Sequence, residues 1–238
     1  MRPPSPYSTD IDLALQLGCS PQLNLAAKKL EAIVPIFCNP AFEVRSPLMN
    51  AARNADVEVF VAAQDIMKTS KIFNSRVATR KLDPLAFQEV ITTLCYRLLN
   101  IDAVNGAKLV SPIARAIHRG LVAFMTTFLL QIGRARHLRY RLLARELKAA
   151  LDNTQFRNSV DPASQLWLLV VAGMSVLNEQ EVKTWLAPRI TEVLDQFGTT
   201  DWSFASRLLS KYPWIKTIHD QNGAQLWKLC FPDEDIEH

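Results

Sequence analysis

Apolar residues recur at helical spacing along most of the chain after residue 82. A first set steps by four, three and four positions, as one face of an amphipathic helix does: Phe87, Ile91, Leu94 and Leu98. The next segment continues the pattern with Ile113, Ile117, Leu121, Phe124, Phe128 and Ile132. Aspartate or serine followed by proline stands at residues 83–84, 111–112 and 161–162. Such a pair supplies an N-cap and a proline at the first helical position, so helices are expected to begin there.

The segment from Leu166 to Leu177 is apolar on every side. A helix without a polar face belongs in the middle of a bundle, because no side of it favours contact with water. We therefore predict an all-α fold, an irregular multi-helix bundle with this apolar helix buried at its centre.

The carboxyl-terminal third contains further start and stop signals. Pro188 is expected to separate a short helix from a longer one or to kink a single helix. Gly198 has the position of the glycine that follows a helix end. The caps expected for the last two helices are Thr200 or Asp201 for the first, and Asp220 or Asn222 for the second.

The first 80 residues have weaker patterns. Helices are expected over residues 23–34 and 55–73, although Val57–Val61 alternates as a short strand would, because no second strand lies near enough to pair with it. We expect four parts: a flexible tail over residues 1–20, helices over 21–80 packed on the main body, a helical domain over 81–231, and an acidic tail over 232–238.

Composition excludes several classes of protein. The 7 glycines among 238 residues never lie closer than thirteen positions apart, so the motifs GxGxxG, Walker A and GxSxG are absent. The four cysteines, Cys19, Cys38, Cys95 and Cys230, lack the spacing of zinc ligands or of a disulfide framework, and buried free thiols are expected. The amino end lacks a signal-peptide stretch, and the apolar runs are too short to span a bilayer. These features predict a soluble, intracellular protein that is not secreted.

Charge is unevenly distributed although the net charge is only +4. Residues 81–150 hold 11 Lys/Arg against 4 Asp/Glu, and residues 151–238 hold 7 against 12. A helix predicted from Gly133 to about Leu151 places five cations on one face, which we call the basic stripe: Arg134, His137, Arg141, Arg145 and Lys148.

The basic stripe has two interpretations. Glu146 lies off the stripe, so neutralisation by i to i+4 pairs within this helix is expected to be nearly absent. The stripe is then a solvated face compensated by the acidic carboxyl-terminal third, or a contact face for an acidic partner or a nucleic acid. Against nucleic acid, no aromatic residues interleave with the arginines, and +4 is a weak charge for a dedicated DNA-binding domain.

No pattern indicates catalysis. His219 beside Asp220 could suggest a general base, but the expected arrangement is a loop histidine before a helix cap. His118 is expected on a polar helical face with Arg115 and Arg119, without a metal-ligand partner within a turn. No serine or cysteine has a base placed to activate it. We therefore predict that the protein is not an enzyme and that it has no catalytic residue, metal ligand or cofactor.

The order and spacing of several segments resemble the carboxyl-terminal regulatory region of fungal zinc-cluster transcription factors, over residues 82–230. The segments are Leu94–Leu99, Ile117–Leu130 with its Phe124–Phe128 (FMTTF), Leu166–Gly173, Trp185-Leu186, Asp201-Trp202, Tyr212–Ile215, and His219-Asp220 through Leu226-Trp227. The resemblance implies an all-helical regulatory domain of nuclear proteins that dimerise and answer to small molecules or protein partners. Family members also carry six amino-terminal cysteines that hold two zinc ions, and residues 1–37 contain nothing similar. Sequence-specific DNA binding is therefore not expected.

From the residues and the resemblance together, we expect a non-enzymatic, transcription-regulator-like domain that acts by association with a protein partner or a second copy. Its expected location is the nucleus, by resemblance, with the cytoplasm as the alternative. Two other functions stay open: a nucleic-acid-binding accessory protein that uses the basic stripe, and a helical protein that binds a small molecule.

Overall fold

The structure is a computed structural model that describes residues 6–23, 29–33, 46–75, 83–132 and 140–232. Regular structure in these ranges is helical, without a β-strand, which confirms the predicted all-α class. The first helices are α1 (Pro6–Leu17), α2 (Leu30–Ile33), α3 (Pro47–Ala55) and α4 (Val57–Asn74). The middle helices are α6 (Pro84–Ile101), α7 (Pro112–Ile132), α8 (Arg141–Leu151), α9 (Thr154–Ser159) and α10 (Pro162–Ser175). The last elements are α11 (Glu179–Glu181), the π-helical turn η4 (Val182–Leu186), α12 (Ala187–Asp195), α13 (Trp202–Leu209) and α14 (Lys216–Cys230).

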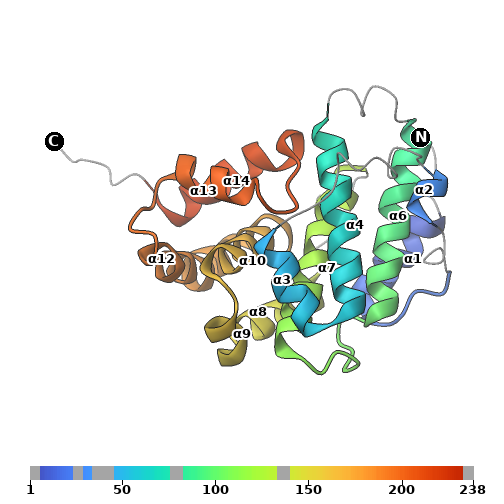
Figure 1. The fold of residues 1–238 in the computed structure, drawn as a ribbon, viewed down its shortest axis with the longest axis horizontal. Coiled ribbons are helices and arrows are strands. Elements are labelled where there is room, and N and C mark those ends of the chain that lie inside the picture. The colour runs from blue at the N-terminus through green and yellow to red at the C-terminus, as the bar shows by residue number, and fades with distance from the viewer. Residues whose placement is uncertain (1–5, 24–28, 34–45, 76–82, 133–139, 233–238) are drawn as a thin grey trace.

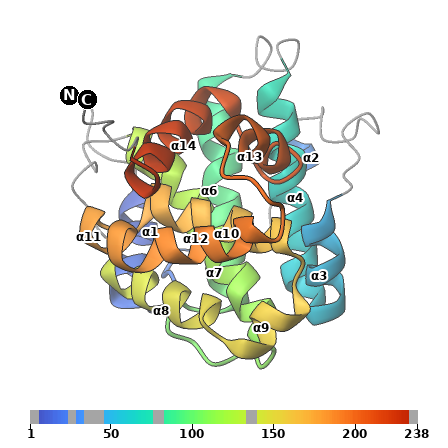
Figure 2. The same ribbon diagram turned by 90° about the vertical axis from the view of Figure 1, so that its left-hand side faces the viewer.

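Helices α7 and α10 form the centre of the bundle. Figure 1 shows α4, α6 and α7 side by side, and Figure 2 shows α10 and α12 running across them. Every residue from Ser164 to Ala172 is buried, so the predicted central position of this apolar helix is confirmed. The two helices approach closely at Gly120, where an added Cβ would lie 2.0 Å from Leu168 Cδ2. Glycine at this position thus permits the crossing.

Most of the predicted helix boundaries in the second half are confirmed. The side chains of Asp83, Ser111 and Asp161 each accept a hydrogen bond from the backbone N–H three residues on, at the starts of α6, α7 and α10. Gly198 has φ +67° and its N–H donates to Leu194 O, as a glycine after a helix end does. Of the two caps expected for α13, Asp201 is the one used.

One expectation for the carboxyl-terminal helices is wrong, and another is decided in part. The last helix begins at Lys216, so neither Asp220 nor Asn222 caps it. Pro188 does not separate two helices, because the helical run continues from α11 through η4 into α12; a kink in this single run stays a prediction. The π-helical turn, in which Ala187 N–H donates to Val182 O, absorbs the change in backbone pattern just before the proline.

Most of the described part of the flexible tail expected over residues 1–20 is instead a packed helix. Residues 6–17 form α1, which packs against α6 and α8. Ile11, Ala14 and Leu15 on this helix are buried, at helical spacing. Two buried tyrosines bind its acidic residues, Tyr96 Oη to Asp10 Oδ2 at 2.8 Å and Tyr140 Oη to Asp12 Oδ1 at 2.6 Å. Burial and these hydrogen bonds hold the segment on the body.

The other expectations for the first 80 residues are met in part. Helix α4 replaces the expected helix over 55–73, and Asp56 caps it by accepting from Glu58 N and Val59 N. Of the helix expected over 23–34, the structure describes residues 23 and 29–33, of which α2 is helical and residues 23 and 29 are not. Most of the acidic tail, residues 233–238, lies outside them.

One side chain connects the end of α4 to the start of α14. Asn74, the last residue of α4, donates from Nδ2 to Trp214 O at 2.7 Å and accepts at Oδ1 from Lys216 N at 3.0 Å. Trp214 lies just before α14, and Lys216 is the first residue of this helix. The amide therefore fastens α14 to the amino-terminal helices.

Cysteine exposure differs from the expected buried thiols. Cys95 is buried and Cys230 is partly buried, but Cys19 is exposed because it follows the end of α1 at the surface. Cys38 lies outside the described residues. In the part of the chain that the structure describes, no helix is long and apolar enough to cross a membrane.

Candidate functional site

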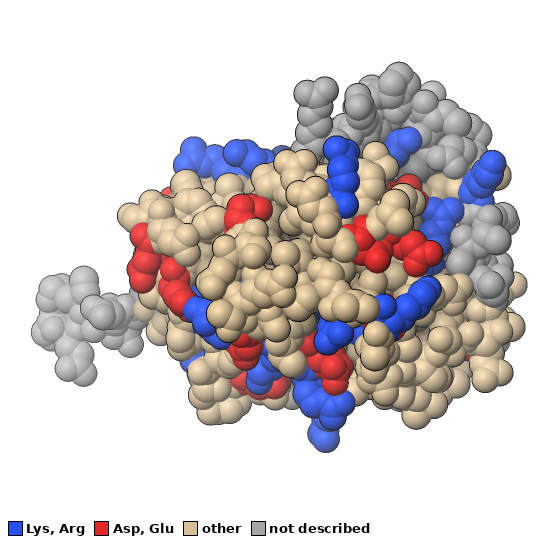
Figure 3. Space-filling model, turned by 60° about the horizontal axis from the view of Figure 1, so that its bottom comes forward, with Lys and Arg blue, Asp and Glu red and all other residues tan. Residues whose placement is uncertain are grey.

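Three residues of the basic stripe, Arg141, Arg145 and Lys148, lie on α8. This helix begins at Arg141, and Arg134 and His137 lie outside the described residues. Arg145 Nη2 pairs with Glu146 Oε1 at 2.9 Å, which is a contact between adjacent residues and not an i to i+4 pair. Lys148 Nζ pairs with Glu181 Oε1 at 3.2 Å, on the acidic carboxyl-terminal third. Figure 3 shows basic and acidic side chains interleaved on the face that it presents.

The cluster expected on a polar helical face is buried instead. His118 and Arg119 on α7 are 0% and 1% exposed, because the loop between α6 and α7 folds over them. Arg119 Nη2 lies 3.2 Å from Asp102 Oδ2 and also donates to Gly106 O. Asp102 in turn accepts from Lys108 N at 3.4 Å. These contacts fix the loop that joins the two helices.

The protonation of His118 follows from its partners. Arg119 Nη1 lies 2.7 Å from His118 Nδ1, and a guanidinium only donates, so Nδ1 accepts. Nε2 therefore carries the proton and donates to Leu98 O at 2.7 Å. Burial lowers the pKa of His118 from 6.5 to about 4, and the Arg119 cation adds to this. Both ring nitrogens are thus occupied by structural hydrogen bonds.

His219 is likewise buried and is not the expected loop residue. It lies in the first turn of α14, with Nδ1 accepting from Ile215 N at 2.8 Å. Thr127 Oγ1 donates to Phe124 O, so its oxygen accepts from His219 Nε2 at 3.0 Å. Burial lowers the pKa of His219 from 6.5 to about 4. Asp220 accepts a hydrogen bond from Trp214 Nε1 at 2.7 Å.

An apolar groove lies between α4 and α6 and has a volume of about 480 Å³. Val57 and Val61, one helical turn apart on α4, are 70% and 48% exposed in it. Ala62 and Ile101 form its buried base, and the ion pairs Arg97–Asp65 and Lys108–Glu58 lie beside it. The groove is therefore an apolar surface with charges of both signs at its edges.

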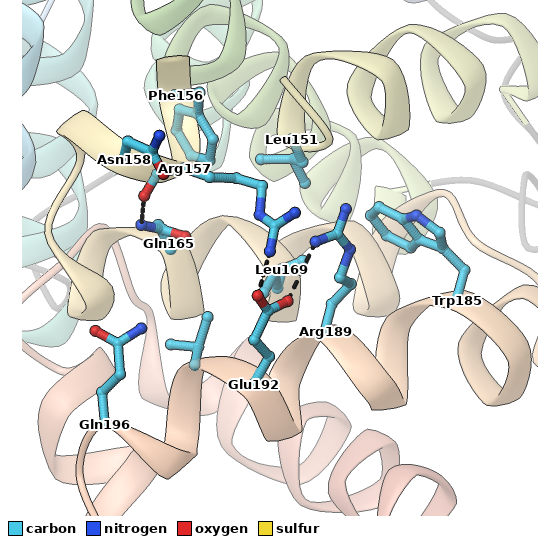
Figure 4. A pocket seen from close by; sticks show the side chains of 11 residues that line it. Leu151, Phe156, Arg157, Asn158, Gln165, Leu169, Trp185, Arg189, Glu192 and Gln196 are labelled. Atoms are coloured by element: carbon cyan, nitrogen blue, oxygen red, sulfur yellow. Dashed lines mark hydrogen bonds and ion pairs between the residues drawn. The ribbon is translucent and has the colours of Figure 1, made fainter. Parts of the chain in front are cut away.

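A smaller pocket of about 160 Å³ lies between α9, α10 and α12. Figure 4 shows the side chains of Arg157 and Arg189 converging on Glu192 from two helices, with Trp185 at the edge. The buried part is apolar and consists of Leu151, Phe156, Leu169 and Val193. No sequence pattern pointed to this pocket, because its residues come from several separate segments.

The described residues contain no cluster of three His, Cys, Asp or Glu side chains that could hold a metal ion. Comparisons with protein-family models, with curated proteins and with solved structures found no match for this chain. The resemblance to the regulatory region of fungal zinc-cluster transcription factors therefore stays a prediction.

Proposed function

We propose that this chain is a non-enzymatic, transcription-regulator-like domain that acts by binding another protein. The observation that carries the proposal is the exposed apolar groove between α4 and α6. The sequence resemblance supports the regulatory part of the proposal, and the groove supports the part that concerns association.

The groove fits an amphipathic helix of a partner protein. Val57 and Val61 repeat at the spacing of four that lets one helix pack its apolar side chains against another. The apolar base buries a partner's side chains, and the flanking Lys108–Glu58 and Arg97–Asp65 pairs offer both charge signs to its polar flanks. A partner helix with apolar residues every three to four positions is the occupant that we propose.

The buried histidines support a non-catalytic role. Each of His118 and His219 uses both ring nitrogens for hydrogen bonds within the body, so neither has a nitrogen left to exchange a proton with a substrate. Their role is to hold α7 against α6 and α14.

The test fuses the full chain to an unrelated DNA-binding domain and measures reporter transcription in a fungal host. The intact chain should change reporter output relative to the DNA-binding domain alone. The double variant Val57→Asp, Val61→Asp should remove this effect, because carboxylates in the groove oppose apolar contact. Leu85→Asp is the matched control, since Leu85 is as exposed as Val57, at 70%, but does not line the groove.

The outcomes separate the two parts of the proposal. If the intact chain leaves reporter output unchanged, the regulatory function is wrong. If the double variant behaves like the Leu85→Asp control, the groove is not the contact surface. Sedimentation of the purified chain tests whether the occupant of the groove is a second copy. A second copy is the occupant if the wild-type chain and the Leu85→Asp control are dimers and the double variant is a monomer. Thermal unfolding of each variant confirms that it is folded.

A further inference from the structure

The chain contains two asparagine–glycine pairs, and the structure places them in different surroundings. Asn105-Gly106 lies in the loop between α6 and α7, and Asn222-Gly223 lies inside α14. Both asparagine side chains are exposed, so access to water does not distinguish the two pairs. The backbone around each glycine does.

An asparagine followed by glycine can lose its side-chain amide without an enzyme. Hydroxide takes the proton of the glycine N–H, and the nitrogen attacks the asparagine Cγ. As this N–C bond forms, the C–N bond of the side-chain amide breaks, and the leaving group takes up a proton and departs as ammonia. Water then opens the cyclic imide at one of its two carbonyl carbons, which gives aspartate or isoaspartate. Glycine favours the attack because it has no side chain to hinder the ring and its backbone turns freely.

The helix around Asn222 opposes this reaction. Inside α14 each backbone N–H donates to the carbonyl four residues earlier, so the Gly223 nitrogen cannot reach Asn222 Cγ unless the helix opens. Asn222 Nδ2 also donates to Ile218 O at 2.8 Å, which holds the side chain along the helix. Gly223 is buried against the indoles of Trp202 and Trp214. Opening the helix here therefore costs packing as well as hydrogen bonds.

The loop around Asn105 restrains its glycine less. Gly106 N–H donates to Ala103 O at 2.8 Å, which is a turn hydrogen bond outside any helix. Breaking it requires local opening of a surface loop, which costs far less free energy than opening a packed helix. The Gly106 nitrogen is therefore released for attack much more often than the Gly223 nitrogen.

The fold requires glycine at position 106. An added Cβ would lie 1.9 Å from Asp102 Oδ1. The Asp102 carboxylate is held in place, because its other oxygen pairs with Arg119 Nη2 at 3.2 Å and its side chain is only 3% exposed. Arg119 Nη2 also donates to Gly106 O at 3.2 Å. The residue that makes Asn105 reactive is thus fixed by the buried ion pair beneath the loop.

The side chain of Asn105 lies against the carboxyl end of α1. An added Cβ at Gly18 would lie 2.8 Å from both Asn105 Cγ and Asn105 Oδ1. Gly18 has φ +70° and its N–H donates to Ala14 O at 2.9 Å, as a glycine after a helix end does. The last turn of α1 contains no basic residue, so the partial negative charge of its terminal carbonyls is not offset within the helix. A carboxylate at position 105 would be repelled by this end of α1.

We infer that Asn105 is a site of spontaneous deamidation, and that the carboxylate formed there loosens the docking of α1. Isoaspartate would also lengthen the main chain between Asn105 and Gly106 and displace Gly106 O from Arg119. This inference is independent of the proposed function, because neither Asn105 nor Gly18 lines the α4–α6 groove.

The first test incubates the full chain in warm, mildly alkaline buffer, once folded and once in denaturant. Peptide mass spectrometry follows the conversion of each asparagine to aspartate and isoaspartate. In denaturant the two pairs should convert at similar rates, because they are the same dipeptide. In the folded chain Asn105 should convert at least about tenfold faster than Asn222. Equal rates at the two sites in the folded chain, or retention of Asn105, would overturn the proposed site.

The second test places the carboxylate directly with Asn105→Asp and measures hydrogen exchange of the α1 backbone amides. Exchange should be roughly two- to fivefold faster than in the wild type. Asn50→Asp is the matched control, because Asn50 is exposed on α3 and the same chemical change there lies on a different helix. Equal exchange in the two variants would show that the carboxylate does not loosen α1. The first test needs no variant, so it stays decisive if Asn105→Asp fails to fold.

Discussion

Arg119 and Asp102 form an ion pair of 3.2 Å in which the two side chains are only 1% and 3% exposed. The pair joins α7 to the residue that follows α6, and it lies beneath the loop that connects these helices. A charge at this depth is stable only with its partner, because water cannot replace the lost interaction.

Asp102→Asn should therefore destabilise the protein by about 3 kcal/mol, since it leaves the Arg119 cation buried without a countercharge. Chemical denaturation gives the free energy of unfolding. Glu179→Gln, which breaks an exposed pair with Lys183, is the control and should leave that free energy unchanged within error. Equal effects of the two variants would contradict a structural role for the buried pair.

Stability should fall as the pH is lowered from about 6.5 to about 4. The pKa values of His118 and His219 are about 4 in the folded chain and 6.5 ordinarily, because burial disfavours the charged imidazole. Below pH 6.5 the unfolded state takes up protons that the folded state refuses, so the two histidines contribute stability above pH 6.5 and lose it on acidification. The loss is about 3 kcal/mol for each histidine at most.

Denaturation curves at several pH values measure this loss. His219→Gln should reduce the difference in unfolding free energy between pH 7 and pH 4.5, because one of the two titrating groups is gone. A pH dependence identical to that of the wild type would show that His219 is not the buried neutral group described above.

The helix α1 should contribute to stability, contrary to a flexible tail. Ile11→Ala should cost about 3 kcal/mol, because Ile11 is 1% exposed and its removal leaves a cavity. Leu13→Ala on the same helix should cost less than about 0.5 kcal/mol, because Leu13 is 49% exposed. Thermal and chemical unfolding of the two variants distinguishes a packed helix from a tail, for which both changes would be neutral.

Trp167 should be more sensitive to substitution than Trp185. The Trp167 indole is buried, stacks on Tyr212 with ring centres 6.1 Å apart, and donates from Nε1 to Pro213 O at 2.9 Å. Trp167→Phe leaves that carbonyl without its donor and should cost about 2 kcal/mol. Trp185→Phe removes a hydrogen bond at the surface and should cost less. Comparison of the two unfolding midpoints checks the order.

The bundle could be predicted where a helix carries its own signals. The apolar run of α10, the Asp83 and Asp161 caps and Gly198 act within a few residues, so local sequence is sufficient to place them. The alternation of residues from Val57 to Val61 also reflects which side chains are buried, but in a helix and not in a strand. In the helix, Val59 is buried while Val57 and Val61 face outward into the groove.

The buried polar groups and the pocket could not be predicted in this way. The pattern of its own helix predicts that Arg119 faces solvent. Asp102, which neutralises it, lies before a loop whose path the sequence does not predict. His219 finds its partner Thr127 on a helix 92 residues earlier. Arg157 on α9 and Arg189 on α12 come together only because the fold brings both side chains to Glu192. These relationships belong to tertiary structure and leave no local pattern.

The link between Asn74 and the start of α14 has a consequence for how the chain is made. The two backbone groups that bind the Asn74 side chain, Trp214 O and Lys216 N, are synthesised some 140 residues after it. Until Lys216 has emerged from the ribosome, α4 lacks this attachment and the apolar surfaces of α7 and α10 lack the cover of α14. Nascent chains that end before Lys216 should therefore bind chaperones and be degraded. The complete chain should form its tertiary structure only after α14 has been synthesised.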